Sequence, residues 1–215
     1  MGYHRAGFEV TGVDIDPRYA KRYPFEFIAG DALEFVKAHG HEFDAIHASP
    51  PCQSYSISRH GNGHETKAPK LVEAVRDLLV ATLRPYVIEN VVGAPIAEPL
   101  MLCGTEFGLS AVDDDGEVLH LSRHRLFESN VFLWGAGGCN CAGRIIGGVY
   151  GGGSSNKIRA RTVRHGGYTP SKSVREKLIG ADWMTLHGLA QSIPPAYTEH
   201  IGAQLLAHVE SERVA

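Results

Sequence analysis

Short β-rich runs alternate with helical runs over the first two-thirds of the chain, and this alternation most constrains the fold. The β-rich runs lie at residues 8–14, 25–28, 43–47 and 86–88. Between them apolar residues recur at helical spacing, most clearly over 71–83. Strands that alternate with helices predict a parallel α/β sheet. In such a sheet, ligands bind beyond the carboxyl ends of the strands.

The last third of the chain changes character. We predict a core over residues 1–134 and a small, loop-rich segment over 135–170, which is rich in Gly, Ser and Arg. Helical patterning returns over 171–215, and these helices should pack back on the core. No apolar run reaches the roughly eighteen residues of a membrane helix, and four cysteines in 215 residues do not make a disulfide framework. We expect a cytoplasmic protein with no membrane partner.

The charge distribution favours a nucleic-acid partner. The whole chain has a formal net charge of -3, but residues 120–175 contain nine Lys or Arg and one acid, Glu128. A basic segment on an acidic body is what a phosphate-binding face needs.

Polar or reactive side chains stand at or just after the ends of three predicted strands. Asp14 follows the first strand, Cys52 comes just after the third, and Glu89 follows the fourth. Asp14 could accept hydrogen bonds from ribose hydroxyls, and Asp31 could accept one from an adenine amino group. Together these acids favour a nucleoside pocket at this edge of the sheet.

Cys52 is the strongest candidate for a reactive group. Pro50 and Pro51 stiffen the backbone before it, and the polar run after it is poor core material. A reactive thiolate needs nearby donors or positive charge, for which Arg123 and Arg125 are candidates. Glu89 at the end of a buried strand would be a general acid, because burial favours the neutral carboxyl.

These motifs resemble the cytosine-5 DNA methyltransferases. Pro50-Pro51-Cys52-Gln53, Glu89-Asn90-Val91 and Arg123-His124-Arg125 occur in the order and approximate spacing of that family. The resemblance continues at residues 12–16, 30–31, 193–195 and 201–202, although Gln191-Ser192 stands where Gly-Asn is usual. The small size and compact variable region look most like enzymes carried by phages and prophages. A role in restriction–modification or in phage evasion stays open.

The resemblance implies a mechanism. A cytosine flipped out of double-stranded DNA would be attacked at C6 by Cys52, while Glu89 engages N3 and the amino group. Arg125 and Arg123 would steady the cytosine carbonyl and the Cys52 loop, and Asn90 would support that loop. S-adenosylmethionine would supply the methyl group that C5 receives.

The resemblance also implies binding residues on a Rossmann-like methyltransferase sheet. Cofactor contacts are expected at Asp14, Ile15, Asp31 and Pro51. The protein is expected to act as a monomer. The expected DNA contacts come from two polar residues after Cys52 and three arginines of the loop-rich segment: Gln53, Ser54, Arg159, Arg161 and Arg164.

The family's opening strand and glycine-rich turn have no counterpart in this sequence. Residues 2–8 match the helix that follows that turn. The strand normally lies between the Asp14 strand and the strand that leads to Cys52. Its loss should leave two unpaired strand edges and weak cofactor binding. Two explanations for the missing turn are open. Met1 is an internal methionine of a protein whose true start lies upstream, or the chain is a degenerate fragment.

Three other functions are possible. Ser49-Pro50-Pro51 also resembles the motif of adenine-N6 and cytosine-N4 methyltransferases, but Cys52 stands where those enzymes need a stacking aromatic residue. Pro50-Pro51-Cys52-Gln53 also resembles the tRNA-modifying branch of the cytosine-5 family. A non-catalytic DNA-binding remnant is the third.

The remaining cysteines suggest a metal site only weakly. Cys139-Asn140-Cys141 is a Cys-x-Cys pair without a second pair at zinc-finger spacing, so we predict no metal. Cys103, between Leu102 and Gly104, is predicted to be core. The alternative is a structural zinc that the Cys-x-Cys pair binds together with nearby histidines: His120, His124 and His165.

Overall fold

The computed structural model describes residues 1–56, 68–151 and 167–214, and the chain forms two compact units. We name each unit after one of its cysteines. The Cys52 unit contains Tyr3–Met101, Arg125–Trp134 and Ile201–Ala215. The Cys139 unit contains Met1–Gly2, Leu102–His124 and Gly135–His200. This division differs from the three consecutive segments that we predicted, because residues 102–124 pair in one sheet with strands from the loop-rich segment.

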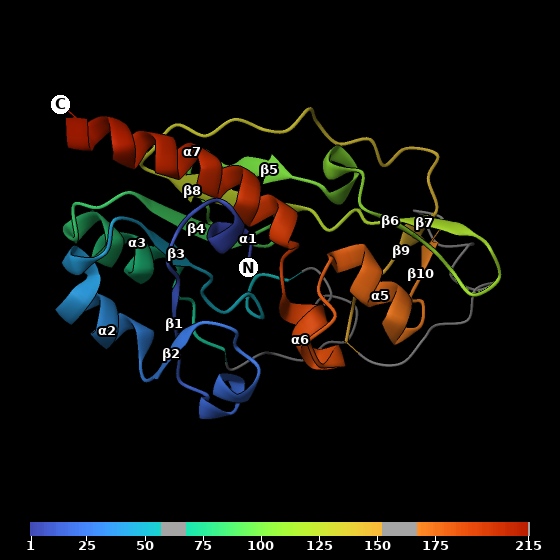
Figure 1. Cartoon of the computed structure of the whole chain (residues 1–215), viewed down its shortest axis with the longest axis horizontal. Coiled ribbons are helices and arrows are strands. Elements are labelled where there is room, and N and C mark those ends of the chain that lie inside the picture. The colour runs from blue at the N-terminus through green and yellow to red at the C-terminus, as the bar shows by residue number, and fades with distance from the viewer. Residues whose placement is uncertain (57–67, 152–166, 215) are drawn as a thin grey trace. The chain divides into compact units, whose positions relative to one another are not determined.

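The Cys52 unit carries the predicted alternation of strands and helices (Figure 1). A two-stranded parallel sheet pairs β1 with β2, and a four-stranded sheet has the order β3-β4-β8-β5. Its elements are α1 (Gly2–Arg5), β1 (Thr11–Asp14), η1 (Pro17–Lys21), β2 (Glu26–Ala29), α2 (Ala32–His39), η2 (Gly40–Glu42), β3 (Ile46–Ala48), α3 (Val72–Ala81), β4 (Tyr86–Asn90), β5 (Leu100–Leu102), β8 (Arg125–Ser129) and the second part of α7 (Pro195–Val214).

The larger sheet is mixed rather than purely parallel. β3 and β4 are parallel, as predicted, whereas β4 and β8 run antiparallel. Among the described residues β1 pairs only with β2, and β3 pairs only with β4. The two sheets therefore remain separate between β1 and β3, as expected for a sheet without its central strand.

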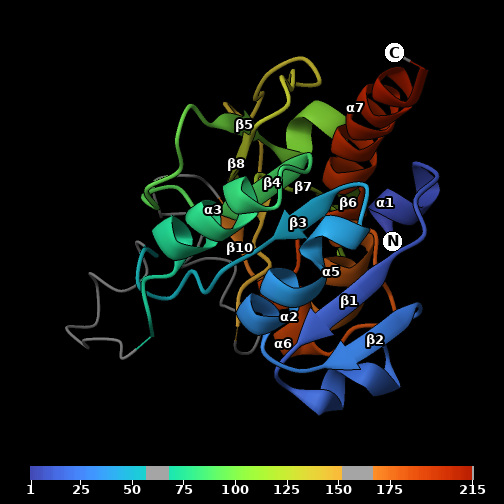
Figure 2. The same ribbon diagram turned by 90° about the vertical axis from the view of Figure 1, so that its left-hand side faces the viewer.

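Helices α2 and α3 cover one face of β3 and β4 (Figure 2). Leucine and valine side chains on the two helices pack against Tyr86 and Ile88 of β4. Asp31 begins α2, because its carboxylate accepts hydrogen bonds from the main-chain N–H groups of Leu33 and Glu34. Every residue of β4 is buried, whereas Gly40 is the only buried residue between positions 3 and 49.

The Cys139 unit is built on a second four-stranded sheet in the order β10-β9-β7-β6. Helices α5 and α6 pack against it through a cluster that includes Leu119, Leu121, Leu178 and Leu189. The remaining elements are η4 (Gly104–Phe107), β6 (Ser110–Val112), β7 (Val118–His120), β9 (Ile146–Gly147), β10 (Gly167–Tyr168), α5 (Lys172–Ile179) and α6 (Leu186–Gln191). Part of the predicted loop-rich segment thus contributes strands.

The last helix belongs to the Cys52 unit over residues 201–214. In the Cys52 unit Gly202 lies against Tyr3 and Ala6, where a Cβ would come within 2.8 Å of the Ala6 side chain. Arg213 forms an ion pair with Asp44 at 2.7 Å. No helix in the described part of the chain is long and apolar enough to cross a membrane.

Candidate active site

The parallel register of β3 and β4 places the Cys52 loop at the end of β4. Ala48 pairs with Ile88, so two residues further on Pro50 comes opposite Asn90. The Asn90 side chain, 1% exposed, donates a hydrogen bond from Nδ2 to the Pro50 carbonyl oxygen at 2.9 Å. A buried side chain at one strand end therefore fixes the turn that presents Cys52.

The backbone folds tightly after Cys52. The main-chain N–H groups of Tyr55 and Ser56 both donate to the Cys52 carbonyl oxygen at 3.0 Å. Gly93 has a φ of 104°, and a Cβ there would lie 3.2 Å from the Tyr55 carbonyl oxygen, so the loop after β4 can approach this turn closely. The turn leaves Cys52 partly exposed, as a nucleophile requires.

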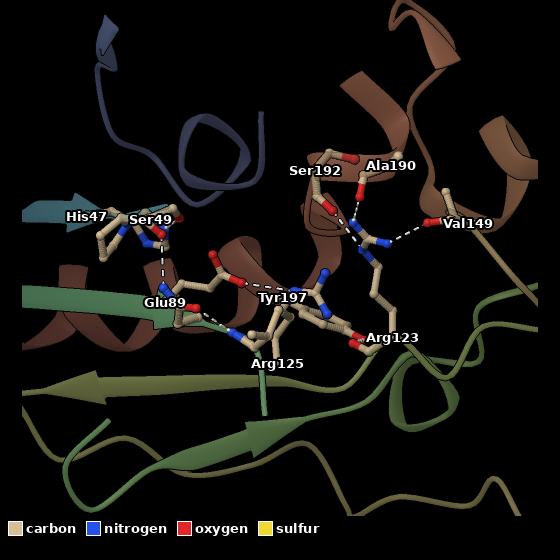
Figure 3. Close-up of polar contacts among 12 residues, drawn as sticks. His47, Ser49, Glu89, Arg123, Arg125, Val149, Ala190, Ser192 and Tyr197 are labelled. Atoms are coloured by element: carbon tan, nitrogen blue, oxygen red, sulfur yellow. Dashed lines mark hydrogen bonds and ion pairs between the residues drawn. The ribbon is translucent and has the colours of Figure 1, made fainter. Parts of the chain in front are cut away.

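Glu89 and Arg125 form the charged pair of the site (Figure 3). Arg125 Nε lies 3.0 Å from Glu89 Oε1, and the pair is largely buried. Antiparallel pairing of Glu89 with Phe127 brings the start of β8 beside the end of β4. Burial, and next the negative charge of Glu89, raise the pKa of the Tyr3 hydroxyl above its usual range.

A hydrogen-bonded chain that the sequence analysis missed borders this site. The Tyr3 hydroxyl and His47 Nδ1 are 2.7 Å apart, and His47 Nε2 is 3.0 Å from Ser49 Oγ. Burial lowers the pKa of His47 to about 4, so the ring is neutral at pH 7. The alternation of His47 with Ser49 just before Pro50 was the only sequence signal for it.

The predicted cofactor residues lie at the ends of β1 and β2. The Gly30 N–H donates to the Asp14 carbonyl oxygen at 3.0 Å, which brings the loops that carry Asp14 and Asp31 together. Asp14 also accepts from the Asp16 N–H at 2.8 Å. Ile15 is 76% exposed. These acids and the exposed apolar side chain have the chemistry of a nucleoside site. Pro51, also expected to contact the cofactor, is partly buried beside Cys52.

Arg123 is bonded to the backbone of the Cys139 unit. Its guanidinium donates to the carbonyl oxygens of Ala190 and Ser192 at 2.7 Å and to that of Val149 at 2.8 Å (Figure 3). The Tyr197 hydroxyl donates to the Arg123 carbonyl oxygen at 3.0 Å. Arg123 is 8% exposed and fastens three segments of this unit together.

The residues predicted to contact DNA fall into two groups. Gln53 is exposed, and Ser54 donates from Oγ to the Ala68 carbonyl oxygen at 2.5 Å. Arg159, Arg161 and Arg164 lie outside the described residues.

Three cysteines and a histidine gather in the Cys139 unit. The side-chain ligand atoms of Cys103, His124, Cys139 and Cys141 all lie within 4.8 Å of one another. Cys103 is buried, as predicted, but its thiol belongs to this cluster rather than to purely apolar core. Burial raises the pKa of the Cys141 thiol to about 12.

Residues 1–94 match the model of a known family, the C-5 cytosine-specific DNA methylases. The match covers the first 94 of the 215 residues and supports membership of this family. The match spans the β1–β2 sheet, β3, the Cys52 turn and β4 with Glu89 and Asn90. Arg123, Arg125 and the cysteine cluster lie beyond it. No curated protein matches the chain.

Proposed function

We propose that the protein is a DNA cytosine-5 methyltransferase and that Cys52 is its nucleophile. The bond from Asn90 to the Pro50 carbonyl oxygen carries this proposal, since it fixes the Cys52 turn to the same strand end that presents Glu89. The match to C-5 cytosine-specific DNA methylases over residues 1–94 supports it independently.

The first step uses the thiolate of Cys52 and the carboxyl of Glu89. The Cys52 thiolate adds to C6 of a flipped cytosine and forms a carbon–sulfur bond. The electron pair of the C5–C6 double bond moves toward N3, where a proton from Glu89 balances the charge. C5 then carries the nucleophilic electron density.

Arg125 controls the protonation of Glu89 that this step requires. In the structure the Arg125 guanidinium neutralises Glu89, and an adjacent cation disfavours a protonated carboxyl. A bound cytosine offers its carbonyl oxygen as a second acceptor for Arg125. Transfer of the guanidinium to that oxygen would release Glu89 to take up the proton that N3 requires.

S-adenosylmethionine would supply the methyl group. Asp14 and Asp31 have the carboxylates to accept hydrogen bonds from the nucleoside part, and the exposed Ile15 side chain offers an apolar surface for the adenine ring. After C5 has received the methyl group, loss of its proton to a base drives elimination. The carbon–sulfur bond breaks and Cys52 leaves as the thiolate.

The remaining predicted site residues have supporting roles. Arg123 holds residues 149, 190 and 192 together and acts as a positioning residue rather than as a contact to the base. Gln53, Ser54 and the basic segment with Arg159, Arg161 and Arg164 bind the DNA.

The test is covalent trapping on a duplex with 5-fluorocytosine at the target position. Fluorine at C5 blocks the elimination step, so the wild-type protein with S-adenosylmethionine should form a complex that survives denaturation. Cys52→Ser should give none, and a duplex with ordinary cytosine is the matched control. The chain is tested as printed and with the residues encoded directly upstream of it.

The outcomes separate the alternatives. A Cys52-dependent adduct on RNA but not on DNA would assign the protein to the tRNA-modifying branch. DNA binding without an adduct in both forms of the protein would identify a non-catalytic remnant. Methyl transfer to nitrogen would overturn the cytosine-5 assignment.

A further inference from the structure

The cluster in the Cys139 unit has the dimensions of a tetrahedral metal site. Cys103 Sγ lies 3.3 Å from Cys141 Sγ, and His124 Nε2 lies 3.2 Å from Cys139 Sγ and 3.8 Å from Cys141 Sγ. A tetrahedral zinc with sulfur ligands at about 2.3 Å and nitrogen at about 2.0 Å places its ligand atoms about 3.5–3.8 Å apart. These three separations lie within about half an ångström of that geometry, and all four ligand atoms lie within 4.8 Å of one another.

The four side chains come from three separate stretches of the chain. Cys103 directly precedes η4, His124 follows β7, and Cys139 and Cys141 share the loop after residue 135. Convergence of one histidine and three of the protein's four cysteines on one point is unusual unless something binds there. The site is partly open to solvent, since Cys103 is buried and Cys139 is exposed.

Nearby polar groups hold the ligands in place. Thr105 Oγ1 lies 3.1 Å from Cys103 Sγ and 3.8 Å from Cys141 Sγ, and the Asn140 N–H donates to Thr105 Oγ1 at 2.9 Å. Arg144 donates from Nε to the Asn140 carbonyl oxygen at 2.7 Å. Hydrogen bonds of this kind orient the ligands of metal sites and stabilise metal-bound thiolates.

We propose that Cys103, His124, Cys139 and Cys141 bind a structural zinc ion. Three cysteines and one histidine are a common ligand set of closed, non-catalytic zinc sites. The ion would fasten the glycine-rich loop around Cys139 to the start of η4 and to the segment after β7. This loop has few apolar side chains of its own, so a metal crosslink would replace the core that it lacks.

A disulfide is the competing explanation for the short sulfur–sulfur distance. A Cys103–Cys141 disulfide requires the two sulfurs at about 2.05 Å, and it would leave Cys139 beside His124 without a role. The zinc site uses all four side chains, whereas the disulfide uses two.

The test is metal analysis of the whole protein, purified without added metal and without a histidine tag. We expect close to one zinc ion per chain by mass spectrometry of the metal content. Replacement by Co²⁺ should give the absorption bands of a tetrahedral cobalt–thiolate site. Less than about a tenth of an equivalent of zinc under reducing conditions, with no cobalt bands on titration, would overturn the proposal, as would iron in place of zinc.

Matched variants locate the site. Cys139→Ser and Cys141→Ser should each lose most of the zinc, whereas Cys52→Ser and the exposed His187→Gln should retain it. His124→Cys keeps four ligands, so it should still bind Co²⁺, with stronger thiolate-to-cobalt absorption. Equal zinc in Cys139→Ser and in the wild type would contradict the assignment even if other variants failed to fold.

Discussion

Two parts of the Cys52 unit differ sharply in how they hold their functional residues. The sheet β3-β4-β8 presents Cys52, Glu89 and Arg125, and its central strand β4 is buried along its whole length. The β1–β2 pair presents Asp14 and Asp31, and none of its residues is buried. The nucleophile half of the proposed site therefore lies on rigid structure, while the nucleoside half lies on an isolated two-stranded ribbon.

The largest predicted effect is a difference in amide hydrogen exchange between these two parts. A two-stranded ribbon without buried side chains opens locally at little cost, whereas β4 should exchange only on global unfolding. We expect β4 amides to exchange at least about a thousandfold more slowly than those of β1 and β2, or about 4 kcal/mol. Exchange measured by NMR or mass spectrometry checks this. Equal protection of the amides in β4 and in β1–β2 would contradict the predicted difference in local stability.

The next effect concerns Glu128, which anchors the buried sheet. Glu128 accepts two hydrogen bonds from Arg76, at 2.5 and 2.8 Å, and one from the Ala97 N–H at 2.8 Å. Glu128→Gln leaves the Arg76 guanidinium without its counter-charge, so we expect a loss of about 3 kcal/mol in the free energy of unfolding. Urea denaturation measures it. Asp77→Asn, at an exposed position of α3, is the control and should change stability by less than about 0.5 kcal/mol.

A smaller effect is predicted for the bond that fixes the Cys52 turn. Asn90→Ala leaves the Pro50 carbonyl oxygen without its buried donor, which should cost about 2 kcal/mol. The same change frees the turn, so formation of the 5-fluorocytosine adduct should slow while Cys52 is still present. Asn90→Asp provides no donor but keeps the side-chain shape. If adduct formation were as fast in Asn90→Ala as in the wild type, Asn90 would not position the turn.

The sequence predicted that Glu89 ends a strand and that Cys52 follows one, because both strands have a recognisable pattern. A β-rich run located β4, helical spacing located α3, and the two prolines before Cys52 marked the turn. The sequence alone could not predict the Glu89–Arg125 ion pair, which depends on the antiparallel strand β8. Nor could it predict the three backbone carbonyl oxygens that accept hydrogen bonds from Arg123. Such contacts join residues that are distant in the chain.

The cysteine cluster is a stronger example of contacts that the sequence alone could not predict. Cys139-Asn140-Cys141 is visible as a pair in the sequence, and His124 was one of three histidines that could join it. Cys103 was assigned to the core because it stands between Leu102 and Gly104. Its thiol reaches the pair only because residues 102–124 pair with strands from the last third of the chain, a topology that no local pattern encodes.

Acidification should destabilise the buried sheet in two steps, through His47 of β3 and then through Glu128 of β8. The folded state lowers the pKa of His47 to about 4, so between pH 6.5 and 4 the unfolded chain binds more protons and stability falls as the pH falls. Burial opposes ionisation of Glu128, but the bonds from Arg76 and Ala97 outweigh it and lower its pKa, so its stabilisation is lost only below about pH 4.5. From pH 6.5 to 5 we expect a loss on the order of 1 kcal/mol from His47.

The His47→Gln variant provides the control for this pH effect. Gln does not titrate in this range, so the variant should show a flatter dependence of unfolding free energy on pH between 6.5 and 5. Exchange at pH 5 should increase first around Tyr3 and His47, which share a hydrogen bond, and later at β4. The prediction fails if the variant and the wild type have the same slope.

The smallest effect comes from Leu83, just after α3. Leu83 has a φ of 56° and is 88% exposed, a left-handed conformation that favours glycine at the end of a helix. Leu83→Gly should stabilise the protein by about 0.5–1 kcal/mol, because it relieves the backbone strain and removes no buried contact. Thermal unfolding measures the gain, and Leu83→Ala, which keeps the strain, is the matched control. Because α3 packs on β4, global opening should become rarer and β4 exchange should slow, while exchange in β1 and β2 should not change. A gain that extended equally to β1 and β2 would mean that the ribbon opens together with the buried sheet.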